Sequence, residues 1–134
     1  MKTKTTIWVA RIMSILVIIF MLFDSVSKLL KAKQVISGTL QLGFLEHHIV
    51  IIGILGLIPT LLYAFPSTSI LGAILLTGYL GGAIVTNLRV DAPLFTNILF
   101  PVYLALFMWG GLWLRDEKLR NLFPLKRKQK DIEE

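Results

Sequence analysis

Residues 70–90 read ILGAILLTGYLGGAIVTNLRV, a stretch that carries no charge before Arg89 and is rich in small residues. An apolar run of this length forms a helix that can cross a bilayer. The small residues recur every four positions and so form two rows along the helix. Each row lets a neighbouring helix approach the backbone closely. We therefore predict a central membrane-spanning helix around which the other helices assemble. The two rows are Gly78, Gly82 and Thr86, and Ala73, Thr77 and Gly81.

The glycines of this helix have two interpretations. Small residues at four-residue spacing commonly serve helix packing, which makes Gly78, Gly81 and Gly82 candidate packing residues. In the second interpretation the first row forms the floor of a polar pocket, because Arg89 follows Thr86 by three positions and lies above that row. We expect Arg89 to point into the end of the bundle rather than toward lipid.

The composition is that of a membrane protein. Of the 134 residues, 55% are hydrophobic and 16% are charged, and the length allows one domain. The net charge of +6 is concentrated in the tails, since seven of the fourteen Lys and Arg residues lie between Arg115 and Lys130. This distribution favours an anionic membrane surface as partner rather than nucleic acid. The absence of cysteine excludes dithiol chemistry, iron–sulfur clusters and thiolate metal sites.

The hydrophobic pattern predicts an all-α membrane protein, a bundle of four transmembrane helices. A short interfacial helix is expected within residues 31–46, with Gly43 as its stop. Pro59 should kink the second span and Pro101 lies inside the fourth. Residues 115–134 form a basic cytoplasmic tail. The predicted spans cover about residues 7–30, 47–65, 69–89 and 95–114.

Charge asymmetry predicts the orientation of the bundle. Four spans place both termini on one side, and that side carries ten Lys and Arg residues against four on the other. The positive-inside rule therefore predicts an N-in, C-in topology. The basic N-terminus followed by an apolar run also fits a cleavable signal peptide, but we favour a retained first span.

Asp24 is the most informative residue of the first span. It lies roughly 20 Å from Arg11 along a helix, which is less than the roughly 30 Å thickness of the hydrocarbon core. A carboxylate at that depth is costly without a partner, and Lys28 is one turn further on the same face. An alternative is an ordinary interfacial ion pair at the end of a helix.

Four spans bring the polar residues of three separate segments to the same outer end. Ionisable groups at membrane depth are candidates for function, because exposing them to lipid costs several kcal/mol. The alternative is a solvated rim, formed because short loops must hold whatever polar residues exist. The candidate pocket residues are Asp24, Lys28, Glu46, His47, Asn87 and Arg89, with Gln41, His48 and Asp91 nearby.

Residue spacing restricts the chemistry of this pocket. His47 and His48 point about 100° apart on a helix and no other histidine exists, so we expect neither haem nor a metal site. The chain contains no phosphate-binding loop, nucleophile elbow or HExxH motif, and it indicates no catalytic residue. The remaining groups suit an anion, a carbonyl-bearing headgroup or a quinone-like ligand. Tyr79 and Tyr103 could add hydroxyl groups, although aromatic packing is the role that we favour for them.

Several segments resemble the DoxX-like family of small four-helix membrane proteins. They are Arg11, the run from Phe23 to Leu29 (FDSVSKL), the run from Gln41 to Phe44 (QLGF), the run from Leu71 to Ala83 (LGAILLTGYLGGA), and the run from Asn87 to Val90 (NLRV). Asn87 stands where many relatives have histidine, which weakens any role for a proton-transferring imidazole there.

The resemblance implies the fold more than an activity. It suggests a small subunit or accessory factor of a quinone-linked redox system in the bacterial inner membrane, with quinone or lipid as ligand. One alternative is a non-enzymatic assembly module that binds a membrane protein partner or forms a homo-oligomer. Another is a protein that binds or transports lipid or a small solute. The sequence leaves the ligand and the oligomeric state open.

Overall fold

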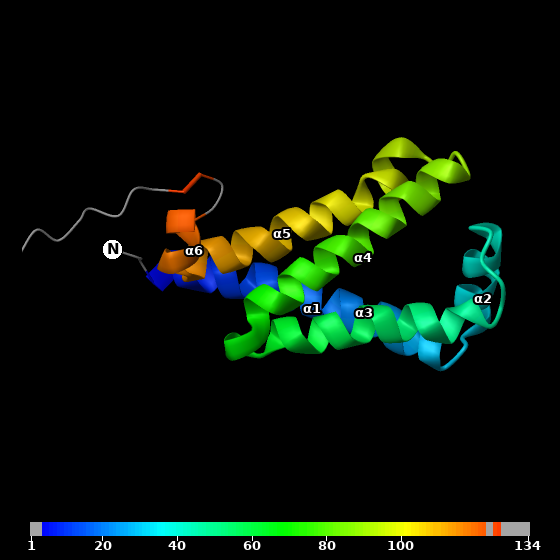
Figure 1. Cartoon of the computed structure of the whole chain (residues 1–134), viewed down its shortest axis with the longest axis horizontal. Helices are drawn as coiled ribbons and strands as arrows, with labels where there is room; N and C mark the ends of the chain where they lie inside the picture. Colours follow the sequence, from blue (N-terminus) through cyan, green and yellow to red (C-terminus); the bar gives the residue numbers. More distant parts are fainter. Residues whose placement is uncertain (1–3, 123–124, 127–134) are drawn as a thin grey trace, which may run out of the picture.

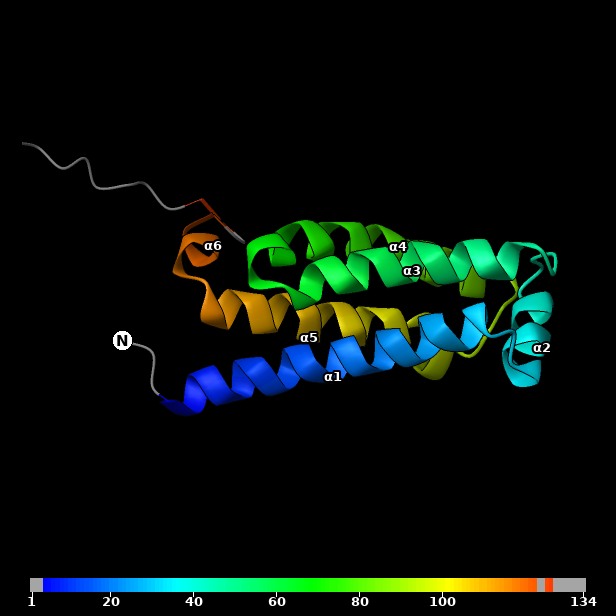
Figure 2. The same ribbon diagram turned by 90° about the horizontal axis from the view of Figure 1, so that it is seen from below.

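The computed structural model describes residues 4–122 and 125–126, and every regular element in this part of the chain is a helix. Four long helices lie lengthwise beside one another (Figure 1). Two short helices lie at opposite ends of the molecule, namely α2 (Lys33–Gln41) at one end and α6 (Glu117–Leu122) at the other (Figure 2). We call these the α2 end and the α6 end. The long helices are α1 (Lys4–Leu29), α3 (His48–Ala64), α4 (Ser69–Arg89) and α5 (Phe100–Arg115).

Three helical segments are long and apolar enough to cross a membrane: Lys4–Leu29, Pro66–Arg89 and Leu94–Arg115. The fourth apolar helix, α3, has 17 residues. At 1.5 Å per residue it is about 25 Å long, which is short of a hydrocarbon core of about 30 Å. The outward faces of the bundle carry many large apolar side chains, as expected for helices that face lipid. Examples are Trp8, Ile19, Phe23, Leu55, Phe95 and Leu106.

The helices pack in the cyclic order α1, α3, α4, α5. Helix α1 contacts α3 and α5, and α4 contacts the same two helices from the opposite side. Buried side chains from all four helices meet along the axis, because each helix turns a narrow row of residues inward. This core includes Val17, Met21, Tyr63, Leu76, Leu80, Met108 and Leu112.

A tight hairpin joins α3 to α4 at the α6 end. The single-turn helix η1 (Pro66–Thr68) reverses the chain, and two hydroxyl groups bind the carbonyl oxygens at the end of α3. Thr68 Oγ1 donates to Leu62 O at 2.6 Å, and Ser69 Oγ donates to Tyr63 O at 2.8 Å. The predicted bounds of the third span, residues 69–89, agree with those of α4.

The predicted short helix between the first two spans is α2. It ends at Gln41, and Gly43 has a φ of +90°, a conformation that glycine adopts without strain. Helix α3 begins at His48, close to the expected residue 47, and Pro59 lies inside it without interrupting the helix. Helix α1 begins at Lys4, a few residues earlier than predicted.

The start of the fourth span differs from the prediction of one helix over residues 95–114. Residues Leu94–Ile98 form a π-helical turn, η2, and α5 begins after it at Phe100. Pro101 explains the break between η2 and α5. Proline has no N–H to continue the backbone hydrogen bonds of the preceding turn, but it fits the first turn of a new helix.

The tail begins with α6, which folds back on the end of α5. Leu119 is buried, whereas Leu122 is exposed. Arg120 Nη1 donates to the carbonyl oxygens of Trp113 and Leu114 at 3.0 and 2.9 Å, which satisfies the last carbonyl groups of α5. The rest of the predicted basic tail, including Phe123, lies largely outside the described residues.

The glycines in tight contact are not those expected from the sequence. A methyl group added at Gly72 would lie 2.7 Å from Pro59 O and against the backbone of Tyr63. One added at Gly111 would lie 3.0 Å from Ala10 O and against Ser14 Oγ. These two glycines therefore allow α4 to pack on α3 and α5 to pack on α1. In contrast, Gly78, Gly81 and Gly82 have no other atom within 4 Å of the position a methyl group would take.

Candidate functional site

The candidate site begins with an ion pair on α1. Lys28 Nζ lies 2.6 Å from Asp24 Oδ2, as expected for residues one turn apart on the same face. The Lys28 side chain is 14% exposed and the Asp24 side chain 31%. The pair is therefore partly sheltered in the bundle and is not an open surface pair.

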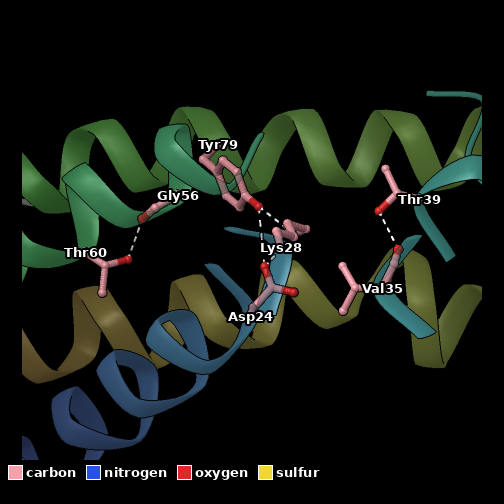
Figure 3. Close-up of polar contacts among 7 residues, drawn as sticks. All are labelled: Asp24, Lys28, Val35, Thr39, Gly56, Thr60 and Tyr79. Carbon is pink, nitrogen blue, oxygen red and sulfur yellow. Dashed lines mark hydrogen bonds and ion pairs between the residues drawn. The ribbon is translucent and has the colours of Figure 1, made fainter. Parts of the chain in front are cut away.

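Tyr79 on α4 completes this ion pair. Lys28 Nζ donates to Tyr79 Oη at 3.1 Å, and Tyr79 Oη donates to Asp24 Oδ2 at 3.5 Å. The ammonium also lies 5.8 Å from the centre of the tyrosine ring. Figure 3 shows the three side chains converging from opposite sides of the bundle. We call them the Asp24–Lys28–Tyr79 cluster.

Two glycines of α3 pack closely against the cluster, Gly56 at the Tyr79 ring and Gly53 at Lys28. A methyl group on Gly56 of α3 would lie 3.2 Å from Tyr79 Cζ and 2.8 Å from Ser25 Oγ. One on Gly53 would lie 3.2 Å from Lys28 Cβ. Larger residues at these two positions would push α1 and α4 away from α3, so the glycines fix the distance between Lys28 and Tyr79.

Three hollows meet at the cluster. The first, of about 430 Å³, lies between α1, α4 and α5 and is called the bundle cavity. The second, of about 560 Å³, lies between α1, α2 and the turn after α4 and is called the α2 cavity. The third, of about 320 Å³, lies between α3 and α4 and is called the glycine groove. Lys28, Leu42 and Asn87 line all three.

The three members of the cluster face different hollows. Asp24 lines the bundle cavity and the α2 cavity, whereas Tyr79 lines the bundle cavity and the glycine groove. The α2 cavity contains most of the polar side chains near the cluster, and the groove is mainly apolar. The cluster therefore lies where a more polar hollow meets a mainly apolar one. The other polar groups of the α2 cavity belong to Thr39, Gln41, Asn87 and Asn97.

Of the six candidate pocket residues from the sequence, the structure brings three together. Asp24 and Lys28 form the ion pair, and Asn87 lines the hollows while its Nδ2 donates to Ala83 O at 2.8 Å. The other three, Glu46, His47 and Arg89, are exposed and line none of these hollows.

The expectation for Arg89 differs from the structure for a geometric reason. Helix α4 ends at Arg89 and the chain turns at Asp91, which has a φ of +55°. A side chain on the last helical residue extends past the bundle, so Arg89 is exposed at the α2 end. Tyr79, ten residues earlier on α4, provides the contact with the ion pair instead.

The two histidines form part of the rim at the α2 end. His47 is exposed, and its ring lies 4.3 Å from that of His48. His48 Nδ1 accepts a hydrogen bond from Leu45 N at 3.2 Å, which stabilises the start of α3. Within residues 4–122 and 125–126 no three His, Asp or Glu side chains come close enough together to hold a metal ion.

The sequence interpretation gave Tyr79 a packing role in preference to a polar one. Its position beside Gly78, on a helix rich in small residues, could have suggested a polar role, because small neighbours leave room around an aromatic hydroxyl. Thr39 and Asn97 were not recognised as candidate site residues. They come from short segments whose position relative to α1 depends on the tertiary fold.

A second polar network lies on the α6 side of the bundle. Ser14 Oγ and Tyr63 Oη share a hydrogen bond of 2.8 Å, and Tyr63 Oη donates to Met108 O at 2.9 Å. Arg115 Nη2 donates to Ser14 Oγ at 3.0 Å. The network ties α1, α3 and α5 together, and since Ser14 and Tyr63 are both buried we regard it as structural.

Comparison with known proteins identifies the family. No curated protein and no solved structure matches the chain. The model of the DoxX-like family matches residues 12–111, which include the ion pair, Tyr79 and most of the bundle. Three helical segments of this chain are long and apolar enough to cross a membrane. The chain therefore belongs to the DoxX-like family and is an integral membrane protein.

Proposed function

We propose that this protein is a small subunit or accessory factor of a quinone-linked membrane redox system and that the Asp24–Lys28–Tyr79 cluster binds the headgroup of a quinone or a similar lipid. The observation that carries the proposal is the hydrogen bond between Lys28 and Tyr79. It joins a charged pair on one helix to a hydroxyl on another, at a point where three hollows meet. Such convergence of a few polar groups in a mainly apolar cavity is typical of small-molecule sites.

The cluster retains unused hydrogen-bonding capacity. An ammonium has three donors, and among the described residues Lys28 uses them on Asp24 and Tyr79 only. Asp24 Oδ1 likewise has no partner in this part of the chain, since both contacts fall on Oδ2. The third Lys28 N–H can donate to a quinone carbonyl, and Asp24 Oδ1 can accept from a quinol hydroxyl.

In this proposal all four long helices cross the bacterial inner membrane, with both termini in the cytoplasm. The side-by-side packing of α3 with α1 and α4 supports a fourth crossing. The basic residues near the two termini support the orientation. The α2 cavity then faces the outer surface and gives water access to Asp24.

The test is binding of a water-soluble short-chain benzoquinone to purified protein in nanodiscs. Tyr79→Phe removes one hydroxyl and is expected to weaken binding about five- to tenfold, which corresponds to one hydrogen bond of about 1 kcal/mol. Lys28→Met removes the donor to the carbonyl and should abolish measurable binding. Tyr103→Phe is the matched control, because its hydroxyl donates to Phe95 O at 3.3 Å on an exposed surface and lines none of the three hollows.

Two outcomes would contradict the proposal. One is binding to the wild-type protein no stronger than to empty nanodiscs. The other is equal binding by the Tyr79→Phe and Tyr103→Phe variants together with unchanged binding by Lys28→Met.

A further inference from the structure

Helices α3 and α4 touch at the hairpin and separate toward the α2 end (Figure 1). At Gly72 the two backbones are in contact, as the closeness of Pro59 O shows. At Gly56 the gap is filled by the Tyr79 ring. Beyond this ring, Gly78 and Gly82 have open space where a side chain would begin. The separation creates the glycine groove directly beside the cluster.

The groove has polar side chains at the cluster and again further along α4, with apolar walls between them. Lys28 and Tyr79 line it at the cluster, whereas Asn87 lies about 12 Å further along α4. Thr39 and Thr86 also line the groove. Ile52 and Leu55 of α3 form one wall, and Phe44 closes the groove toward α2. The opposite wall is the backbone of α4, because Gly78 and Gly82 have no side chains to cover it.

We propose that this groove holds the hydrocarbon tail of the ligand whose headgroup lies at the Asp24–Lys28–Tyr79 cluster. The inference rests on the proposed function and adds to it the class of ligand: a headgroup with an acyl or isoprenoid tail that enters sideways from the membrane. This assignment of the tail rests on the connection between the groove and the bundle cavity. Lys28 and Tyr79 line the groove and also face the bundle cavity, so a headgroup bound to them in the bundle cavity can extend its tail into the groove.

The size of the groove suits a slim chain. The groove measures about 320 Å³. The volume lies at the lower end of the range for small-molecule pockets, which is roughly 300–1,000 Å³. Among the described residues, Gly78 and Gly82 make no close contact with another helix of the chain, so they leave room for a tail.

The experiment compares two quinones that share a headgroup and differ in the tail, one with a methyl group and one with a ten-carbon chain. Affinities in nanodiscs are corrected for partition into empty nanodiscs. Gly82→Leu and the double variant Gly78→Leu/Gly82→Leu fill the groove. Gly81→Leu is the matched control, since Gly81 lies on the same helix, has equal open space and does not line the groove.

We expect the groove variants to lower the affinity for the long-tailed quinone at least tenfold and that for the methyl quinone less than twofold. Gly81→Leu should change neither. The inference fails if the groove variants bind the long-tailed quinone as well as the wild type does, or if they lose both quinones equally. If the wild-type protein binds neither quinone, the proposed function fails and the inference fails with it.

Photolabelling of the wild-type protein gives a test that does not depend on folded variants. A quinone with a diazirine at the end of its tail should label peptides that contain residues 52–55 or 78–82. Labelling confined to the outer faces of α1 or α5 would overturn the assignment. Crosslinking of one chain to another through residues 78 and 82 would also overturn it, because the groove would then be a helix-docking surface.

Discussion

Lys28 on α1 and Tyr79 on α4 are separated by 51 positions in the sequence and share a hydrogen bond of 3.1 Å. The bond connects two helices that otherwise pack mainly through α3 and α5. It also lies where the more polar α2 cavity meets the mainly apolar glycine groove. This contact is therefore the feature that converts a local ion pair into a candidate ligand site.

The first prediction concerns the ion pair. Asp24→Asn leaves the Lys28 ammonium without its charged partner in a sheltered position, so it should lower the free energy of unfolding by about 2 kcal/mol. The double variant Asp24→Asn/Lys28→Met should recover most of that loss, because it removes the charge as well. Thermal unfolding in mild detergent measures both. An additive effect of the two substitutions would show that the pair contributes nothing to stability.

The second prediction concerns the glycine at the α3–α4 contact. Gly72→Ala places a methyl group 2.7 Å from Pro59 O and against the Tyr63 backbone, so the two helices must move apart. We expect a loss of about 2–3 kcal/mol in the free energy of unfolding. Gly78→Ala, which enters open space, should leave stability unchanged or raise it by up to about 1 kcal/mol. Equal effects of the two substitutions would contradict the packing described here.

The third prediction concerns the buried network on the α6 side of the bundle. Tyr63→Phe leaves Ser14 Oγ and Met108 O without the tyrosine hydroxyl, so the free energy of unfolding should fall by about 1–3 kcal/mol. Tyr103→Phe serves as the control and should cost less than about 0.5 kcal/mol, because Tyr103 is exposed. Quinone binding to Tyr63→Phe should match the wild type, since Tyr63 lines none of the hollows at the cluster.

The fourth prediction concerns topology. The chain has no cysteine, so single cysteines introduce the only reactive thiols. In intact cells an impermeant thiol reagent should label Gln34→Cys and Ala92→Cys but not Ser67→Cys or Lys118→Cys. Labelling of Gln34→Cys together with Ser67→Cys would show that α3 does not cross the membrane. The opposite labelling pattern would reverse the proposed orientation.

Much of the fold could be predicted from the sequence because it is local. The apolar run of residues 69–89 is bounded by polar turns, and its bounds agree with those of α4. Asp24 and Lys28 are one turn apart on one helix, so their pairing required no knowledge of the other helices. Gly43 marked the end of α2, because a positive φ is easiest for glycine.

The neighbours of each helix face could not be predicted in the same way. In a soluble protein the apolar face of a helix shows which side is buried, but in a membrane protein the lipid-facing side is apolar too. The sequence therefore showed that glycines were abundant without showing which of them pack. Gly72 and Gly111 are in tight contact, whereas Gly78 and Gly82 line a groove.

The sequence by itself determined the class of protein, the positions of the helices and the ion pair on α1. Only the tertiary structure decided that Tyr79 joins this pair and that Arg89 does not. The reason is geometric: the register of α4 against α1 is set by close contacts between helices, of Gly72 with Pro59 and Tyr63 and of Gly56 with Ser25 and Tyr79. A shift of α4 by two residues would turn Tyr79 away, and no local pattern in the sequence encodes that register.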